Sequence, residues 1–453
     1  MMVWTLDRVG QALREQLQLP AHPEGQEPLG GVSTDTRTIA RGDIFVALRG
    51  ERFDGHDFLP QAAAAGAAAL VADDPSRTAG LGVPVFPVRD TTHALGALGS
   101  WWRRTWNGTV VAVAGSNGKT TTKELIRAAL AGSLDVYATT GNLNNQVGVP
   151  LTLLKLPPTA AVAIVEVGTS VPGEVDNLRR IVAPDLAVVT SIGEEHLEGL
   201  GSLEGVLNEE AAIYQGVEVG VAPASQPEIG QAARSRARQV IEAGLDAGGV
   251  RPDAWGMSAD GRGWATFGEQ RLLMQVPGAH NLRNAMLAIA VARACGITDA
   301  AAIEGVGKVE PLDMRGRWLA RGELTIINDA YNANPASMRE AIALLDSLDS
   351  ARPRVLVLGS MRELGPQSAT LHEEIAERAL SSGIDLVGGI GDFVAPLSAR
   401  TPAKSRVVTA ADVPELWDSL RHRLPRNAIV MLKASRGVRL ERLVPFLEQW
   451  ATG

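Results

Sequence analysis

One segment, residues 109–121, restricts the fold more than any other part of the chain. It reads TVVAVAGSNGKTT, and the apolar run 109–114 predicts a strand that leads through a glycine-bearing turn into a helix beginning at Thr120. The first N–H groups of a helix lack partners within the helix and attract anions, so this unit is typical of a phosphate-binding loop in a parallel α/β sheet. The alternative is a chance Gly-Lys-Thr in a surface turn, which the flanking strand and helix do not favour.

The lysine of this loop is conspicuous because lysine is rare in the chain. Of the 43 Lys and Arg residues only six are Lys. Lys119 stands where it can neutralise the β- and γ-phosphates of ATP, while Thr120 offers a hydroxyl to Mg²⁺. The usual P-loop pattern has Gly at the position of Val113, so the loop is a shortened variant. Its predicted nucleotide-binding residues are Gly115, Ser116, Asn117, Gly118, Lys119, Thr120 and Thr121.

An alternation of strands and helices continues along the chain. Strands are predicted over 161–167 and 186–191 and a helix over 281–294, and a second such series begins after Pro311. Continuous apolar strands between helices predict parallel sheets covered on both faces. The expected fold class is α/β with three domains: a small α/β N-terminal module (1–88), a central P-loop-type parallel-sheet ATPase domain (89–313) and a C-terminal Rossmann-like α/β domain (314–453).

Two regions are less regular than the rest. In the first domain, short apolar runs predict strands around one Ala-rich helix over residues 58–69. The segment 223–249 is polar and rich in Ala and Arg, and its pattern supports no assignment.

Composition excludes several classes of protein. The net charge of −8 provides no global basic field for nucleic acid or an anionic membrane. The one cysteine, Cys295, excludes an intramolecular disulfide and a multi-cysteine metal site. Asp7 and Arg8 stand where a signal peptide would have its apolar segment. No stretch approaches the roughly 18 apolar residues of a membrane span. A cytoplasmic protein is expected.

Two further residues lie at the carboxyl ends of predicted strands of the central domain. The apolar part of the strand 161–167 terminates at Glu166, and His196 lies just past the strand 186–191. The carboxyl ends of parallel strands meet at one edge of a sheet, so both side chains are expected near the phosphate loop, where a carboxylate suits Mg²⁺. The alternatives are a capping or solvated Glu166 and a structural His196.

These residues carry a family resemblance. GSNGKTT, the loop GNLNNQVGVPLTLL, Glu166, His196 and the segment PGAHNLRNAMLAIA together resemble the Mur ligase family, the amide ligases of peptidoglycan assembly. The first domain, with GVSTDTRTIARGDIFVALRGERFDGHDF, is similar to the family's UDP-binding domain. INDAYNANPASM, LGSMRELGPQS and LKASRG resemble one branch's last domain. The resemblance covers nearly the whole chain and is weakest across 215–265.

The resemblance implies a role for each matching residue. Lys119, Glu166 and His196 would be catalytic, and Thr120, Glu166 and His196 would serve Mg²⁺. The asparagines of GNLNNQVGVPLTLL and of PGAHNLRNAMLAIA have simpler alternatives. Residues 142–145 could form a polar turn, and Asn281 and Asn284 could cap a helix. The implied ATP contacts beyond the loop are Asn281, Asn284, Arg315 and Asp329, and the implied substrate contacts are Asp35, Arg37, Asn142, Asn144, Asn145, Asn332, Asn334, Lys433, Ser435 and Arg436.

One departure from the family pattern concerns the metal site. The family has a lysine after the histidine whose carbamate bridges two Mg²⁺ ions, and here Glu210 occupies that position, with no lysine anywhere from 156 to 307. Two outcomes are expected: either Glu209 or Glu210 reaches a metal, or the second metal site is weakened. Of the two residues, Glu210 is assigned a catalytic role. The alternative is two solvated glutamates on a helix face. Smaller departures are Ser191 for Asn and Ala434 for Gly.

The resemblance also implies a reaction. It is the ATP-dependent joining of D-alanyl-D-alanine to UDP-N-acetylmuramoyl-tripeptide through an acyl phosphate, by a monomer. Three alternatives compete with this expectation. They are a sister Mur or folylpolyglutamate-type amide ligase, a non-catalytic nucleotide-binding relative, and a small-molecule kinase with a plain P-loop.

Overall fold

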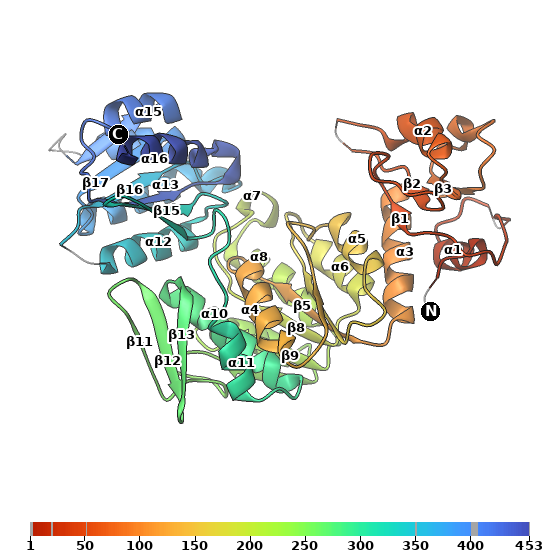
Figure 1. Cartoon of the computed structure of the whole chain (residues 1–453), viewed down its shortest axis with the longest axis horizontal. Helices are drawn as coiled ribbons and strands as arrows, with labels where there is room; N and C mark the ends of the chain where they lie inside the picture. Colours follow the sequence, from red (N-terminus) through yellow and green to blue (C-terminus); the bar gives the residue numbers. More distant parts are fainter. Residues whose placement is uncertain (1–2, 20, 51, 349–350, 400–405, 453) are drawn as a thin grey trace.

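The computed structural model describes residues 3–19, 21–50, 52–348, 351–399 and 406–452. The predicted α/β class is confirmed: the described residues form three predominantly parallel sheets and one small antiparallel sheet. Figure 1 shows the amino-terminal part at one end of an elongated molecule, the central part in the middle and the carboxyl-terminal part at the other end. Within the described residues, no helix is long and apolar enough to cross a membrane.

The amino-terminal part is a parallel four-stranded sheet with short helices. Helix α1 (Leu6–Leu13) precedes the strands, and the predicted helix over 58–69 is a 3-10 turn, Gly55–Phe58, followed by α2 (Leu59–Ala64). That prediction was too long, because Gly66 turns the chain at φ +93° and residue 69 already belongs to the sheet. The sheet order is β1 (Val32–Ser33), β2 (Ile44–Val46), β3 (Ala69–Ala72) and β4 (Val85–Pro87).

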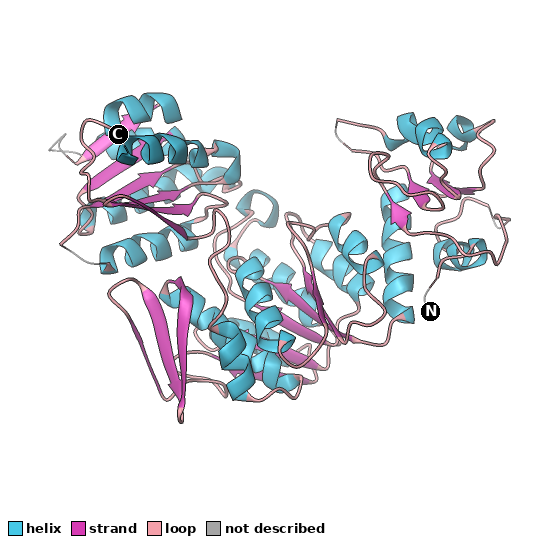
Figure 2. Cartoon of the chain, viewed as in Figure 1, coloured by secondary structure: helices cyan, strands magenta, loops and turns pink. Residues whose placement is uncertain are grey.

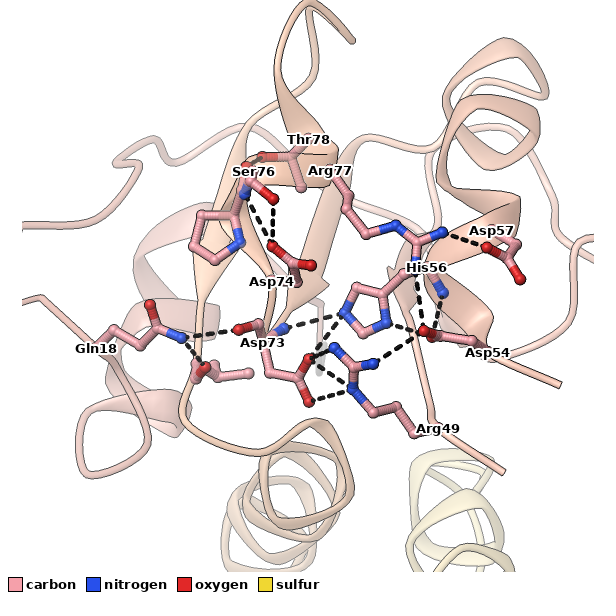
Figure 3. A network of polar contacts seen from close by, with 12 residues as sticks. Gln18, Arg49, Asp54, His56, Asp57, Asp73, Asp74, Ser76, Arg77 and Thr78 are labelled. Carbon is pink, nitrogen blue, oxygen red and sulfur yellow. Dashed lines mark hydrogen bonds and ion pairs between the residues drawn. The ribbon is translucent and has the colours of Figure 1, made fainter. Parts of the chain in front are cut away.

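A polar network holds the loops of this sheet together (Figure 3). The buried His56 ring lies between two carboxylates, with Nδ1 2.6 Å from Asp54 and Nε2 3.1 Å from Asp73. Arg49 makes ion pairs with both of these carboxylates, at 2.9 and 2.7 Å. Because each buried polar group has a partner, the network ties the turn before α2 to the end of β3 at little desolvation cost.

The central sheet places the phosphate loop at its topological switch point. Helix α3 (Thr91–Thr105) leads into it. All its pairings are parallel, and β5 lies between β8 and β7, so the chain leaves β5 towards one edge and later returns to build the other. In such sheets the ligand crevice opens at the carboxyl ends of the strands on either side of this reversal. The order is β10 (Gln239–Ala243), β9 (Val219–Pro223), β8 (Leu186–Val189), β5 (Thr109–Ala114), β7 (Val162–Glu166) and β6 (Val136–Ala138).

Helices cover both faces of this sheet, as the continuous apolar strands predict. Val111 and Val113 of β5 pack in one hydrophobic core, and Val110 and Ala112 pack in the core on the opposite face. The side chains that point to either face of the sheet are therefore buried. The first core lies under α4 (Lys119–Ala131), α10 (Ala279–Ala294) and α11 (Asp299–Val306), and the second lies under α3, α5 (Gly148–Leu154) and α6 (Glu174–Val182).

Two regions held structure that the sequence did not reveal. The unassigned segment 223–249 contains α9 (Pro227–Arg234) and edge strand β10. Beyond it, a small antiparallel sheet stands apart from the central sheet, as Figure 2 shows. Its strands are β11 (Ala254–Met257), β12 (Arg262–Phe267) and β13 (Gln270–Pro277).

The carboxyl-terminal part is a second doubly wound sheet. Only β14 runs antiparallel to its neighbour. Asp329 at the end of β15 is in register with Lys433 at the end of β19, so the two side chains reach the same sheet edge. The order is β14 (Arg317–Arg321), β15 (Leu324–Asp329), β19 (Ile429–Lys433), β16 (Arg354–Leu358), β17 (Leu386–Ile390) and β18 (Val407–Ala410).

Helices also sandwich this sheet, and one core extends into the central part. The first pair, α12 (Pro335–Ser347) and α13 (Ser368–Ser381), covers one face, and α15 (Val413–Leu420) and α16 (Leu443–Thr452) cover the other. Leu197 and Leu200 of α7 (Leu197–Leu200), which follow the central strand β8, are buried in the α12–α13 core. The two sheets are thus joined by apolar packing next to His196.

Candidate active site

A cavity of about 770 Å³ lies between the central and carboxyl-terminal sheets. Its walls are the carboxyl ends of β5, β7 and β8 on one side and of β15 and β19 on the other. The structure brings most of the predicted residues to this one place. They are Ser116, Asn117, Gly118, Lys119, Thr120, Thr121, Asn144, Asn145, Glu166, His196, Asn281, Asn284, Arg315, Asp329, Asn332 and Lys433.

The phosphate loop depends on two glycines with positive φ. Gly115 has φ +115°, and a Cβ there would lie 2.5 Å from the Thr190 hydroxyl; Gly118 has φ +83°, and a Cβ there would lie 2.7 Å from the Asn284 amide nitrogen. Neither position accepts a side chain without displacement of its neighbour. Asn284 therefore packs directly against the loop that it was predicted to assist.

The amides of the loop have different roles. Gly115 N–H donates to Glu210 (2.7 Å), Ser116 N–H to the Ser191 carbonyl (2.8 Å) and Asn117 N–H to the Ser191 hydroxyl (3.2 Å). These three N–H groups stabilise the loop itself. The anion-binding groups are then the N–H groups at the start of α4, which have no partner within a helix.

Lys119 is surrounded by carboxylates. Its Nζ donates to the Gly115 carbonyl and lies 3.9 Å from a carboxylate oxygen of both Glu195 and Glu210. Burial lowers the pKa of Lys119, but the charges of Glu195, Glu210 and Glu166 outweigh it, so the pKa is raised and the side chain is held as a cation. The loop therefore presents a fixed positive charge to the cavity.

Glu166 has one oxygen bound within the protein and one without a partner. Its side chain is 2% exposed, Oε1 accepts from the Asn144 amide (2.9 Å), and Oε2 is buried with no hydrogen-bond partner. A capped or solvated Glu166 is excluded by this burial. An unpartnered buried carboxylate oxygen costs free energy unless a ligand satisfies it.

His196 links the two sheets. It has a left-handed backbone, φ +49°, and its Nδ1 contacts Glu363, which follows β16 of the carboxyl-terminal sheet. Its Nε2 lies 3.8 Å from Glu195. Burial lowers the pKa of His196, but the hydrogen bond to Glu363 and the charge of Glu195 outweigh it, and the pKa is raised.

Both glutamates at the departure from the family pattern are buried. Glu209 accepts from Gly173 N–H (2.7 Å) and Val175 N–H (2.8 Å) at the start of α6. Glu210, on α8 (Leu203–Ala211), is fully buried beneath the phosphate loop. The alternative of two solvated glutamates is therefore wrong, and neither residue is part of the cavity wall.

The surroundings of Glu210 disfavour its ionised form. Burial, opposed by Lys119 and reinforced by Glu195, raises the pKa of Glu210 to about 7. Its Oε1 accepts no hydrogen bond from a described N–H group. Glu210 thus positions the amide of Gly115 and stands next to the Lys119 ammonium.

Removing this carboxylate should slow the reaction. We expect Glu210→Ala to lower kcat by about tenfold or more, about 1.4 kcal/mol of barrier, because Gly115 N–H loses its acceptor and Lys119 loses a neighbouring charge. Steady-state ADP release measures this. Glu204→Ala, at an exposed position of the same helix, is the matched control. Equal kcat for the two variants would contradict a role for Glu210.

The carboxyl-terminal wall contributes a buried lysine. Lys433 Nζ forms an ion pair with Asp329 (2.7 Å) and donates to the Asn332 carbonyl (3.0 Å). Beside it, the Arg315 guanidinium lies 3.8 Å from the centre of the Tyr331 ring. This wall faces the phosphate loop across the cavity, and its charged groups are the cations Arg315 and Lys433 and the carboxylates Asp329 and Glu340.

Ion pairs join the central and carboxyl-terminal parts beside the cavity. Arg339 of α12 contacts Glu194 of the central part at 3.0 Å, and Arg283 of α10 contacts Glu340 of α12. Sequence reasoning missed Glu194, Glu195, Arg339 and Glu363, and its only available signal was the acidic pair directly before His196.

Several predicted substrate residues lie elsewhere. Asp35 and Arg37 pair with each other at 2.6 Å in the amino-terminal part, and the Arg37 hydrogen bond lowers the pKa of Asp35 to about 2. Asn142 is exposed in its loop. The other three belong to the carboxyl-terminal part: Asn334 caps α12, Ser435 bonds to Ala333 and Arg362, and Arg436 lies over Tyr331. Substrate contact by these residues stays a prediction.

The cavity suits a divalent cation that arrives with phosphates. Among the described residues, no three His, Cys, Asp or Glu side chains are grouped to hold a metal ion alone. Mg²⁺ commonly takes one or two carboxylates, with phosphates and water as its other ligands. Glu166 Oε2 is buried and unpartnered, and Thr120 stands in the loop beside it in the cavity wall. These residues fit Mg²⁺ as a companion of a nucleotide.

Comparisons with known proteins agree with this geometry. Residues 28–102 match the catalytic domain of the Mur ligase family, 113–292 its middle domain and 314–436 its glutamate ligase domain. The UDP-N-acetylmuramoyl-tripeptide–D-alanyl-D-alanine ligase of Bacillus subtilis is 35% identical over 97% of both chains. The enzyme of the same name from Escherichia coli is 34% identical over 94% of this chain and 95% of its own.

Solved structures show the same similarity. MurF from Acinetobacter baumannii superposes with a TM-score of 0.89 at 28% identity and covers 99% of both chains. MurF from Thermotoga maritima, solved in complex with ADP, superposes with a TM-score of 0.82 at 26% identity over 93% of this chain and 97% of its own. The phosphate loop, the cavity between two α/β sheets and this similarity over nearly the whole length lead to one conclusion, that the chain belongs to the Mur ligase family.

Proposed function

We propose that this protein joins D-alanyl-D-alanine to UDP-N-acetylmuramoyl-tripeptide and converts ATP to ADP and phosphate, in the cytoplasmic stage of peptidoglycan synthesis. The observation that carries the proposal is the cavity in which the phosphate loop faces Lys433 and Asp329 of the last domain. The names of the relatives from Bacillus subtilis and Escherichia coli support this choice of substrates. We also propose that the enzyme acts as a monomer, without nucleic acid or membrane.

ATP is proposed to bind with its phosphates at the start of α4. The N–H groups from Gly118 to Thr121 and the Lys119 ammonium would contact the phosphates. The ADP complex of the Thermotoga maritima relative supports a nucleotide in the cavity. The remaining nucleotide contacts are assigned to the other predicted residues of the cavity wall, Asn281, Asn284, Arg315 and Asp329.

Mg²⁺ is proposed as the companion of the phosphates, with Thr120, Glu166 and His196 as the residues that serve it. When bound, it offsets the negative charge that develops on the transferring phosphoryl group. Of the three, Glu166 has the unpartnered oxygen that such an ion requires. His196 acts from the boundary between the domains, because its Nδ1 is used by Glu363.

The proposed reaction proceeds in two steps. A carboxylate oxygen of the tripeptide attacks the γ-phosphorus and ADP leaves, which gives an acyl phosphate. The amine of D-alanyl-D-alanine then attacks the acyl carbon and loses a proton, and phosphate leaves as the amide forms. Lys119 and the α4 N–H groups stabilise charge on the transferring group, which is where sites of this kind gain most of their rate.

The substrate is proposed to extend from the amino-terminal domain to the last one. Asp35 and Arg37 would contact the UDP group, and Asn142, Asn144 and Asn145 the channel between it and the cavity. Asn144 and Asn145 already line the cavity. The peptide end is assigned to Asn332, Asn334, Lys433, Ser435 and Arg436.

The competing functions are less well supported. A sister ligase for another amino acid, or a folylpolyglutamate-type ligase, would not account for relatives named for D-alanyl-D-alanine at 35% identity over 97% of the chain. A non-catalytic relative would not need a half-buried Lys119 and an unpartnered Glu166 oxygen in one cavity. A plain kinase would not need the amino-terminal domain.

The proposed function is tested with purified protein, ATP, Mg²⁺, UDP-N-acetylmuramoyl-tripeptide and D-alanyl-D-alanine. We expect ADP and a UDP-pentapeptide in equal amounts, and no pentapeptide when the dipeptide is omitted. A product formed instead from a shorter UDP-acceptor and a single amino acid would identify a sister ligase. ADP without any amide product would favour the kinase or the impaired relative.

The lack of a lysine from 156 to 307 leads to a separate prediction. No lysine of this segment is available for carbamylation, so removal of CO₂ and bicarbonate should leave kcat unchanged. Degassed buffer with and without added bicarbonate measures this. A loss of activity that bicarbonate restores would show that a lysine elsewhere in the chain carries a carbamate.

A further inference from the structure

Glu195 is an acidic residue of the cavity to which the proposed function assigns no role. It is 5% exposed and lines the cavity directly after Glu194 and before His196. Its Oε2 lies 3.9 Å from Lys119 Nζ and 3.8 Å from His196 Nε2, distances too long for direct hydrogen bonds. Its Oε1 is buried and accepts no hydrogen bond from a described N–H group, and a hydrogen bond between the Glu195 and Glu210 side chains helps to raise the pKa of Glu210. The carboxylate is therefore close to the phosphate loop but poorly satisfied.

Three carboxyl groups, those of Glu166, Glu195 and Glu210, act on the single ammonium group of Lys119. Arg315 also lines the cavity, but its guanidinium stacks on Tyr331 of the last domain. Proton binding by Glu210, whose pKa is raised to about 7, relieves part of this negative charge, and a cation bound in the cavity would relieve the rest.

Glu195 and Glu210 differ in what they can reach. Glu210 spends Oε2 on the Gly115 amide and lies beneath the loop, outside the cavity wall. Glu195 and Glu166 both line the cavity, and each has one buried oxygen that accepts no hydrogen bond from a described N–H group. Of the two carboxylates that face Lys119, only Glu195 is thus placed to contact a cation within the cavity.

We propose that Glu195 supplies an oxygen ligand to the divalent cation that accompanies the nucleotide phosphates. This inference rests on the proposed nucleotide-binding function. The cation would then have two protein carboxylates, Glu166 and Glu195, with phosphate oxygens and water completing its shell, which is a typical environment for Mg²⁺.

The test measures binding of Mn²⁺ to the full-length protein in the presence of saturating ADP, by electron paramagnetic resonance of free Mn²⁺. We expect Glu195→Gln to weaken Mn²⁺ binding by about tenfold or more. Water-proton relaxation should show additional water on the bound Mn²⁺, because the lost ligand is replaced by solvent. Glu198→Gln, an exposed carboxylate nearby, removes the same charge and should have little effect.

Two further variants separate a ligand from a counter-charge. Glu195→Asp keeps the charge but shortens the side chain, so weaker Mn²⁺ binding indicates a ligand, and unchanged binding would overturn the proposal even if Glu195→Gln fails to fold. Glu210→Gln should weaken Mn²⁺ binding less than Glu195→Gln, and the reverse order would assign the ligand to Glu210 instead. Absence of Mn²⁺ and ADP binding in the parent would overturn the nucleotide site itself, whereas parent-like binding in both Glu195 variants overturns the role of Glu195 alone.

Discussion

Replacing Lys119 with Met should lower kcat on the order of a thousandfold, about 4 kcal/mol of barrier. Lys119 provides a fixed positive charge in the phosphate loop, and three carboxylates hold it in the cationic state. In Lys119→Met those carboxylates would face the phosphates without a neutralising cation. The variant should therefore lose both transition-state stabilisation and affinity for ATP, which initial-rate measurements at varied ATP concentration separate.

Lys155→Met is the matched control for this experiment. Lys155 is exposed at the end of α5, away from the cavity wall. Circular dichroism and thermal unfolding should show both variants folded. If Lys119→Met retains a kcat within a few-fold of the Lys155→Met control, the phosphate loop does not serve the reaction that we propose.

Replacing Lys433 with Met should lower kcat on the order of a hundredfold while ADP affinity changes little. Lys433 belongs to the last domain, is buried, and holds Asp329 and the Asn332 carbonyl at the cavity wall. The main groups that we propose to bind the phosphates lie on the central domain. Loss of kcat with retained ADP binding would therefore show that the last domain completes the site only for catalysis.

The control for Lys433→Met is Lys308→Met, at an exposed lysine paired with Glu304 on the surface. Since Lys433→Met leaves Asp329 without its partner, thermal unfolding must accompany the kinetics. A second variant, Asp329→Asn with Lys433 intact, tests the same wall from the other side. Parent-like kcat in both Lys433→Met and Asp329→Asn would contradict the role of the last domain.

Much of the fold follows from local pattern. The strand 109–114 was predicted with the bounds that the structure shows, because a continuous apolar run between helices is typical of a strand in a covered parallel sheet. The antiparallel sheet of 254–277 was not predicted. Burial alternates along β12 and β13, but the exposed Leu273 lies between the buried Leu272 and Met274, so the apolar residues of the sequence do not follow the alternation.

The site could be predicted only as far as sheet topology determines it. Glu166 ends β7 and His196 follows β8, the two strands on either side of β5, and that alone placed them near Lys119. The contact of His196 with Glu363 joins residues 167 positions apart in different domains, which no local pattern reveals. The burial of Glu210 beneath Gly115 likewise depends on how α8 packs against the sheet.

The most direct test of the account uses UDP-N-acetylmuramoyl-tripeptide labelled with ¹⁸O in its terminal carboxylate, with ATP, Mg²⁺ and D-alanyl-D-alanine. Mass spectrometry then follows the pentapeptide and the released phosphate. An acyl phosphate requires that one carboxylate oxygen leaves with the phosphate, so we predict UDP-pentapeptide together with phosphate that carries a single ¹⁸O. Absence of the pentapeptide, or its formation with unlabelled phosphate, would contradict the proposed ligase.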